Sequence, residues 1–178
     1  MLGRPEVQKL YLGKTTMTNN NLNIKLRPTE VSDLIFLFQF QLDKEGAYLA
    51  AFKPKDQTDK SAYLNKHTKL LDDPRVNNQT IILDNNIVGS IAKFVMEGDA
   101  EITYWIDRNL WGQGIATKAL NKFLTIETSR PMFGRVAFDN IGSQKVLEKC
   151  GFVKIGADKG FANARQAEIE EYIYKISE

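Results

Sequence analysis

The spacing of hydrophobic residues changes along this chain, and each change predicts a different kind of element. Apolar residues fall at helical intervals over 30–42 and again over 59–71. From position 80 onward they alternate with polar residues, which is typical of strands buried on one face. Helical spacing returns over 114–128. The chain therefore mixes helices and strands without an internal repeat.

Turn residues divide the alternating part into short strands. Asp84, Asn85 and Asn86 mark one turn, and Gly98 with Asp99 marks the next. The predicted strands are 23–27, 80–83, 87–96, 101–106, 135–138, 152–155 and 169–176. The predicted helices are 30–41, 59–71, 114–128 and 143–150. We expect one α/β domain of the mixed α+β type, with a mainly antiparallel sheet of about seven strands and about four flanking helices.

Capping residues mark the helix ends. Thr29 stands where the first helix would begin, and Thr58 or Asp59 stands before the second. Gly151 follows the last predicted helix, in the position where a glycine commonly ends one.

The first 21 residues show no sustained hydrophobic period. We predict an N-terminal extension over residues 1–21 and a single domain over residues 22–178. The longest apolar run, 34–38, is far shorter than the roughly 20 residues of a membrane-spanning helix. The N-terminus lacks the apolar segment of a secretory signal. A cytoplasmic protein without a membrane partner is expected.

Composition changes this picture little. The 178 residues suffice for one domain with a core. Lys and Arg number 24 against 22 Asp and Glu, and a net charge of +2 gives no reason to expect nucleic-acid binding. Cys150 is the only cysteine, so no intramolecular disulfide can form. His67 has no accompanying set of metal ligands, so we predict no metal site and interpret His67 and Cys150 as structural.

The segment 105–117, WIDRNLWGQGIAT, carries the most chemical information, because a strand ends there and a helix begins at Gly-Gln-Gly. The first N–H groups of a helix lack internal partners, and the helix dipole makes that end positive. Gly112 and Gly114 have no Cβ, so an anion can approach the backbone closely. The segment predicts a site for a phosphate or pyrophosphate.

Two other phosphate motifs fit this segment poorly. The P-loop requires Gly-Lys followed by Ser or Thr, and no lysine follows these glycines directly. The dinucleotide fingerprint requires a third glycine where Thr117 stands, and a parallel strand where an antiparallel meander is predicted. Taken alone, the segment also allows a glycine-rich turn that only connects a strand to a helix.

Two motifs resemble those of the GNAT acetyltransferase superfamily. Residues 111–116, WGQGIA, resemble the acetyl-CoA signature [RQ]-x-x-G-x-[GA], with Trp111 in place of Arg or Gln. Residues 140–152 are similar to the pattern N-x-x-S-x-x-v-L-E-K-x-G-F. The longer string YWIDRNLWGQGIATKAL resembles the Rim-type branch that acetylates the N-termini of ribosomal proteins. The resemblance covers roughly residues 23–176.

This resemblance implies a GNAT-like domain that uses acetyl-CoA as co-substrate and no metal. The strand holding Trp105 and Ile106 would splay from the strand ending at Phe138, and the pantetheine arm would lie between them. Asn140 would contact the arm, whereas Ser143 and Lys145 would contact the phosphates or adenine. Helix capping by Asn140 and Ser143 is the alternative. The implied cofactor-binding residues are Trp105, Ile106, Trp111, Gly112, Gln113, Gly114, Ile115, Ala116, Thr117, Asn140, Ser143 and Lys145.

The resemblance also implies direct attack of a neutral amine on the thioester in a ternary complex. Many family members protonate the departing thiolate with a tyrosine seven residues after the Asn, where this chain has Leu147. Tyrosines that can substitute in principle are Tyr104, Tyr172 and Tyr174. Glu101 matches the position of the glutamate base in histone-acetylating members and is the candidate catalytic base. The alternative for Glu101 is a solvated residue at the end of a hairpin.

The expected function is N-acetylation of a protein N-terminus or a small-molecule amine, by a monomer or a homodimer. Leu147 and Trp111 motivate the alternative of a non-catalytic acyl-CoA-binding regulatory domain. A nucleotide-binding protein that uses the Gly-Gln-Gly turn is a third and weaker hypothesis. Contacts to the acceptor amine are expected from the first two helices, their connection over 45–60 and a loop over 156–166, none of which carries a motif.

Overall fold

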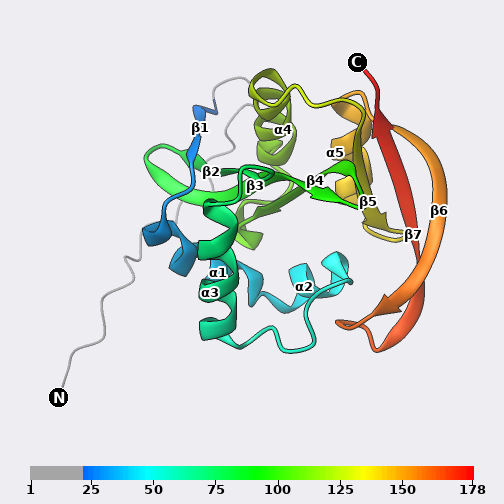
Figure 1. Ribbon diagram of the computed structural model, residues 1–178, viewed down its shortest axis with the longest axis horizontal. Helices are drawn as coiled ribbons and strands as arrows, with labels where there is room; N and C mark the ends of the chain where they lie inside the picture. The colour runs from blue at the N-terminus through cyan, green and yellow to red at the C-terminus, as the bar shows by residue number, and fades with distance from the viewer. Residues whose placement is uncertain (1–21) are drawn as a thin grey trace.

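A computed structural model describes residues 22–178 (Figure 1), so the extension predicted over residues 1–21 lies outside the described residues. The strands are β1 Ile24–Pro28, β2 Asn77–Leu83, β3 Asn86–Met96, β4 Asp99–Ile106, β5 Met132–Ala137, β6 Val153–Ala162 and β7 Ala167–Ile176. The α-helices are α1 Leu34–Gln41, α2 Lys44–Ala50, α3 Lys60–Leu71, α4 Ile115–Ile126 and α5 Ile141–Lys149. Two short 3₁₀ helices are η1 Val31–Asp33 and η2 Arg108–Leu110.

All seven strands form one sheet in the order β1-β2-β3-β4-β5-β7-β6. Every neighbouring pair is antiparallel except β4 and β5, which are parallel. Helices α4 and α5 cover one face of the sheet, and α1, α2 and α3 cover the other (Figure 1). The predicted mixed, mainly antiparallel sheet is confirmed. Within residues 22–178, no helix is both long and apolar enough to cross a bilayer.

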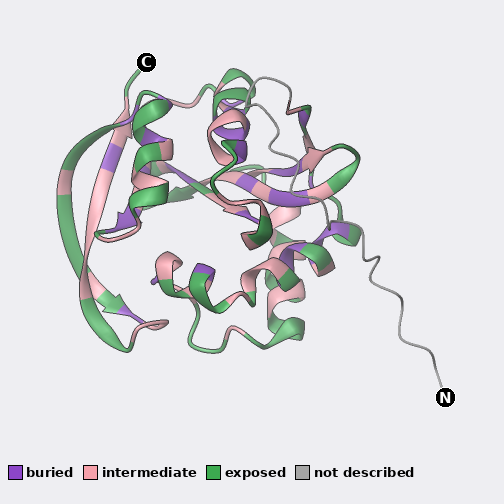
Figure 2. Ribbon diagram, turned by 180° about the vertical axis from the view of Figure 1, so that it is seen from behind, coloured by how far each residue is buried: buried purple, intermediate pink, exposed green. Residues whose placement is uncertain are grey.

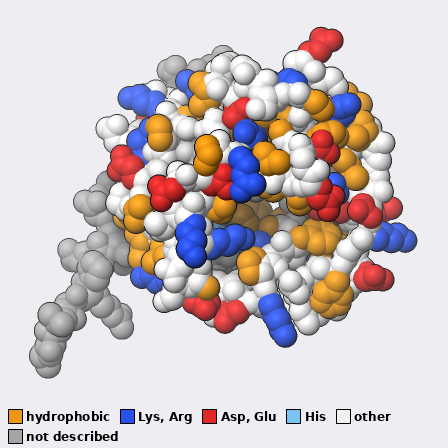
Figure 3. Space-filling view, viewed as in Figure 1, with side chains coloured by type: hydrophobic (Ala, Val, Ile, Leu, Met, Phe, Trp, Pro, Cys, Tyr) orange, Lys and Arg blue, Asp and Glu red, His pale blue; other side chains and the backbone are white. Residues whose placement is uncertain are grey.

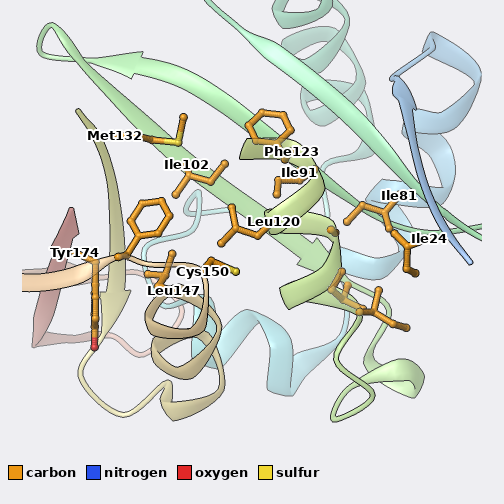
Figure 4. Close-up of a cluster of buried hydrophobic side chains, with 14 of the residues drawn as sticks. Ile24, Ile81, Ile91, Ile102, Leu120, Phe123, Met132, Leu147, Cys150 and Tyr174 are labelled. Carbon is orange, nitrogen blue, oxygen red and sulfur yellow. The ribbon is translucent and has the colours of Figure 1, made fainter. Parts of the chain in front are cut away.

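The main hydrophobic core lies between the sheet and the pair α4 and α5 (Figure 4). The apolar stripe predicted for α4 is confirmed, because Ile115, Ala119, Leu120 and Phe123 are all buried. Burying a Leu or Phe side chain contributes about 1.5–3 kcal/mol, so this stripe fixes α4 on the sheet. The buried residues concentrate on the inner faces of these elements, and the outer faces are exposed (Figure 2).

The structure differs from the sequence prediction in two elements, α2 and β6. α2 was not predicted, so the described residues hold five α-helices rather than about four. Its seven residues are too few to show a helical period, although Asp43 caps it by accepting a hydrogen bond from the Gly46 N–H. The predicted loop over 156–166 is largely strand β6. β6 is an exposed edge strand, so its residues do not alternate between apolar and polar.

The helix ends follow the predicted caps with one exception. Asp59 caps α3, and Gly151 follows α5 with a φ of +90°. Thr29 does not cap the first helix, because Glu30 precedes η1 and exchanges hydrogen bonds with the first turn. The Thr29 hydroxyl instead accepts a hydrogen bond at 3.0 Å from the Thr80 hydroxyl. Because β1 and β2 are antiparallel neighbours, Thr29 serves the sheet rather than the helix.

Candidate active site

The sheet is open between β4 and β5. Within the described sheet these strands pair at two positions, Ala100 with Met132 and Glu101 with Phe133, and then diverge. On its other edge β4 stays paired with β3 as far as Ile106. The β4 main-chain groups that face β5 beyond Glu101 therefore lack a strand partner. The splay implied by the family resemblance is present.

A cavity of about 1200 Å³ follows this opening. Its walls include the glycine turn and α5 on one face of the sheet, and residues of α1, α2 and α3 on the other. Figure 3 shows a hollow with hydrophobic side chains in its depth and Lys or Arg side chains at its rim. Two ligands can thus meet in the plane of the sheet after approaching from opposite faces.

The glycine turn at the start of α4 has the geometry of an anion site. Gly112 and Gly114 have φ values of +76° and +78°, and a Cβ built on either would meet no atom within 4 Å. Gly114 is the N-cap of α4, and the Lys118 N–H donates to its carbonyl at 3.0 Å. The N–H groups before Lys118 in the first turn have no acceptor within the helix. The backbone of this turn therefore fits a diphosphate, as the sequence predicts.

The two tryptophans of the predicted cofactor site have different surroundings. The Trp111 indole N–H donates to the Ile106 carbonyl at 2.9 Å, and the Arg108 guanidinium lies 4.7 Å from its ring. Trp111 thereby braces the glycine turn against the end of β4. The Trp105 indole N–H donates to the Phe40 carbonyl at 3.0 Å, and its ring contacts α2 so closely that a Cβ on Gly46 would come within 2.9 Å. The Trp105 side chain thus faces the half of the cavity lined by α1, α2 and α3.

The predicted residues of α5 lie at its N-terminus. Asn140 caps the helix, because its Oδ1 accepts from the Ser143 N–H at 3.1 Å. Its Nδ2 donates to the Leu49 carbonyl of α2 at 3.2 Å. The hydrogen bonds of Asn140 are therefore those of a helix-capping residue, as the alternative interpretation predicted. Ser143 and Lys145 line the cavity on the same side as the glycine turn.

Glu101 is buried rather than solvated. Its side chain belongs to a residue that is 3% exposed, and Oε1 accepts from Arg135 Nε at 3.1 Å. Burial raises the pKa of Glu101, and the Arg135 guanidinium opposes that rise. Arg135 also approaches Glu171, with Nη1 3.7 Å from Oε2. Arg135 and Glu171 line the cavity, whereas the buried Glu101 lies behind them and is not part of its lining. The base candidate therefore belongs to a three-residue cluster, and only Glu101 could be predicted from the sequence.

The three tyrosines that could substitute for the missing acid at Leu147 lie in different surroundings. Leu147 is 1% exposed and packs in the core. The Tyr174 hydroxyl donates to Glu148 Oε1 at 3.1 Å, and the Tyr172 ring lies under the Lys154 ammonium. Tyr104 lines the cavity, and its hydroxyl donates to the Ser143 carbonyl at 3.2 Å. Burial raises the pKa of Tyr104, so its hydroxyl is protonated at neutral pH.

The residues predicted to be structural are buried or packed. Cys150 is buried, and burial raises the pKa of its thiol to about 11. His67 stacks on Tyr63 with ring centroids 4.0 Å apart. Among residues 22–178, no group of three or more His, Cys, Asp or Glu side chains is placed to hold a metal ion. Lys53 and Tyr63 also line the cavity, although their segments carry no motif from which this could be predicted.

Comparisons with known proteins agree with this geometry. The model of the acetyltransferase (GNAT) domain family matches residues 23–153. A Bacillus licheniformis protein described as the uncharacterized N-acetyltransferase p20 is 25% identical over 164 residues, which are 86% of this chain and 92% of that protein.

Two solved structures share the fold. The microcin C7 self-immunity acetyltransferase MccE, in complex with acetyl-CoA and AMP, has a TM-score of 0.74 at 19% identity and covers 90% of this chain and 94% of its own. The ribosomal L7/L12 alpha-N-protein acetyltransferase RimL, in complex with CoA, has a TM-score of 0.71 at 21% identity. That match covers 86% of this chain and 93% of RimL.

Proposed function

The chain belongs to the GNAT acetyltransferase domain family, and from this membership we propose that it transfers the acetyl group of acetyl-CoA to a primary amine. The observation that carries the proposal is the opening between β4 and β5, which leads to the glycine turn of α4 through one cavity. An unpaired strand edge next to an anion site suits a ligand that has amides at one end and a diphosphate at the other.

The donor would lie along β4 with its diphosphate at the turn. N–H groups from Gly112 to Thr117 would bind the pyrophosphate, and the free edge of β4 near Trp105 and Ile106 would bond the pantetheine amides. Ser143 and Lys145 stand beside this path on α5 and would contact the phosphates. Asn140 would contribute by holding the N-terminus of α5 in place as well as by contact with the arm.

The reaction forms a C–N bond and breaks the C–S bond of the thioester. The lone pair of the neutral amine attacks the carbonyl carbon, one amine proton leaves to a base, and the thiolate takes a proton as it departs. We propose Glu101 as the base, acting through water beside Arg135 and Glu171. Because Leu147 is buried at the position where the family resemblance implies a tyrosine, another group must protonate the thiolate. Of Tyr104, Tyr172 and Tyr174, only Tyr104 lines the cavity, and we propose it as that group.

The acceptor determines how much the base matters. At pH 7, freeing a lysine amine of pKa about 10.4 costs roughly 4.6 kcal/mol, whereas an α-amine near 7.9 costs only about 1.2 kcal/mol. RimL modifies a protein N-terminus according to its description, and another structure of the same fold is described as a spermidine N-acetyltransferase. The fold is therefore compatible with acceptors as different as a protein N-terminus and a polyamine, so the choice must be sought in the cavity.

Ligand binding and turnover test the proposal. Acetyl-CoA at 100 times its dissociation constant should stabilise the fold by about 2.7 kcal/mol, and ATP or NAD at the same concentration should not. Release of CoA should then depend on an added amine. Binding without turnover of any amine would favour a non-catalytic acyl-CoA-binding domain, an alternative that the burial of Leu147 motivates. Stabilisation by ATP or NAD alone would contradict both.

A further inference from the structure

The carboxylates that line the cavity are all engaged by groups of their own chain. These pairs are Glu45 with Arg108, Asp56 with Thr58, Asp59 with Ala62, Asp139 with Arg165 and Glu171 with Arg135. Some cap a turn or a helix, and the others are neutralised by arginines. The arginines neutralise Glu45, Asp139 and Glu171, whereas Asp56 and Asp59 bond uncharged groups and keep their charges at exposed positions. In the half of the cavity lined by α1, α2 and α3, where the acceptor would bind and which we call the acceptor half, free negative charge is therefore confined to exposed residues.

Lysines in the same half of the cavity are not neutralised. Lys53 Nζ donates to Gln41 Oε1 at 2.5 Å and lies 4.3 Å from the centroid of the Trp105 ring. Lys66 lines the cavity from α3 and repels Lys53. Among the described residues, the salt bridges of this structure include neither lysine. The half-buried Lys53 and the exposed Lys66 are thus two like charges without an ion-pair partner among the described residues.

The surroundings of Lys53 make this arrangement unfavourable without an anion. Burial, and then repulsion from Lys66, lower the pKa of Lys53 to about 8. Tyr63 and His67 complete the wall, and burial lowers the pKa of His67 to about 4, so it carries no charge at neutral pH. An incoming anion would find Lys53 already positioned by Gln41 and Trp105, and it would relieve the repulsion between the two ammonium groups.

We propose that the acceptor amine carries an anionic group, a carboxylate or a phosphate, and that Lys53 binds this group with assistance from Lys66. The inference rests on the proposed acetyl transfer and adds the chemical class of its acceptor. The anion lies against Lys53 and the Trp105 ring, while the amine points toward the opening between β4 and β5. A polyamine is disfavoured, because its positive charges would face the two lysines.

Pairs of amines that differ only in the anion test the inference. At saturating acetyl-CoA, kcat/KM is measured for O-phosphoethanolamine against ethanolamine, for β-alanine against its amide, and for the peptide amide Asp-Ala-Ala against Asn-Ala-Ala. We expect the anionic member of at least one pair to be preferred by about ten- to a hundredfold, the size of a charge-assisted hydrogen bond. The first two pairs represent a free small molecule, and the third represents an acidic protein N-terminus.

Three lysine-to-methionine variants test whether Lys53 causes the preference for anionic amines. Lys53→Met keeps an unbranched apolar side chain over Trp105 and should lower kcat/KM for the anionic member far more than for the neutral member, so that the preference is lost. Lys66→Met, at an exposed position of α3, should reduce the preference for the anionic amine by a smaller factor. This variant can be measured even if Lys53→Met does not fold. Lys69→Met, on the exposed surface of the same helix, is the matched control and should change nothing.

The outcomes separate the two proposals. If the protein binds no acetyl-CoA and acetylates no amine, acetyl transfer itself is wrong. If neutral amines or spermidine react as fast as anionic ones, or Lys53→Met lowers both members of a pair equally, only the anion inference is overturned. If acetyl-CoA binds but nothing is acetylated, calorimetric titration of the CoA-loaded protein with the same pairs decides. Tighter binding of the anionic member, lost in Lys53→Met, then supports the inference, and equal or absent binding of both members overturns it.

Discussion

Three glycines with positive φ allow the backbone effect of a substitution to be separated from its effect on a ligand. Gly98, Gly112 and Gly114 have φ values of +96°, +76° and +78°, and a Cβ on any of them would meet open space. A side chain at such a φ costs roughly 1–2 kcal/mol. Gly112 and Gly114 line the cavity, whereas Gly98 lies in the turn between β3 and β4. A substitution at any of the three glycines would therefore introduce similar backbone strain. Only a side chain at Gly112 or Gly114 would also face the proposed diphosphate.

Gly114→Val should weaken acetyl-CoA binding by about ten- to a hundredfold, because the side chain keeps the phosphates away from the N–H groups of α4. Gly98→Val is the control, since it introduces similar strain away from the cavity. Isothermal calorimetry measures the affinity, and urea unfolding measures the stability. Equal affinities in the two variants, when both are folded, would contradict a diphosphate site at this turn.

Glu101→Gln should lower kcat by about ten- to a hundredfold while the dissociation constant of acetyl-CoA stays the same. The amide keeps the shape and still accepts from Arg135, so the fold should survive. A base acts in its deprotonated form, so wild-type kcat should fall as the pH drops through the raised pKa of Glu101. That acidic limb should be lost or shifted in the variant.

Glu171→Gln is the matched comparison for Glu101→Gln, because both carboxylates lie beside Arg135. Full kcat for Glu101→Gln from pH 6 to 9, together with a loss in Glu171→Gln, would assign the base to Glu171. Full kcat in both variants would mean that the amine proton leaves by water alone.

At the scale of elements, Asn140 joins two helices that lie on opposite faces of the sheet. It caps α5 through Ser143 and donates to the Leu49 carbonyl of α2. This link spans the opening beside the unpaired part of β4, because α2 and α5 approach the sheet from different sides there (Figure 1). The amide side chain of Asn140 therefore helps to set the geometry of the opening.

Asn140→Ala should reduce the free energy of unfolding by about 1–2 kcal/mol, because it removes the cap and the link to α2. Asn140→Asp should cost less, since a carboxylate still caps α5 and only the donor to Leu49 is lost. Urea denaturation of both variants measures the difference. Equal losses in the two variants would show that the cap contributes nothing.

Elements with a local signal could be predicted from the sequence, and those that depend on distant partners could not. The glycine turn and the α4 stripe follow from residues close together in the chain, and both are present. α2 is too short for a period, and β6 is too exposed for one. The partners of Glu101 also had no sequence signal, because Arg135 lies 34 positions away and reaches it only through the parallel pairing of β4 and β5.

On the scale of the whole molecule, the hairpin of β6 and β7 closes the sheet against α2. Arg165 pairs with Asp139 at 2.7 and 2.8 Å, and its Nε donates to the Tyr48 carbonyl at 2.9 Å. The Asn163 side-chain amide donates to the Lys53 carbonyl at 2.9 Å. The turn of this hairpin thus holds the segment that carries Lys53, although more than a hundred residues separate them in the chain.

Arg165→Met should raise the KM for the acceptor amine several-fold and leave the dissociation constant of acetyl-CoA unchanged, because it loosens α2 without touching the glycine turn. Arg75→Met is the control, since its ion pair with Asp73 is local and exposed and contributes little to stability. Steady-state kinetics and calorimetry provide the two measurements. A parallel loss of affinity for acetyl-CoA would show that the hairpin supports the whole cavity.

The opening between β4 and β5 also bears on how such a protein diversifies. The turn that fits the diphosphate precedes α4, and Lys53 follows α2 on the other side of the sheet, with Trp105 of β4 between them. Apart from the Asn140 link between α2 and α5, mutations on one side therefore need little compensation on the other. We expect that, in proteins that evolve from this one, the residues that bind acetyl-CoA change little while those that bind the acceptor vary. A gene duplication could then yield a new acceptor specificity with the same donor site.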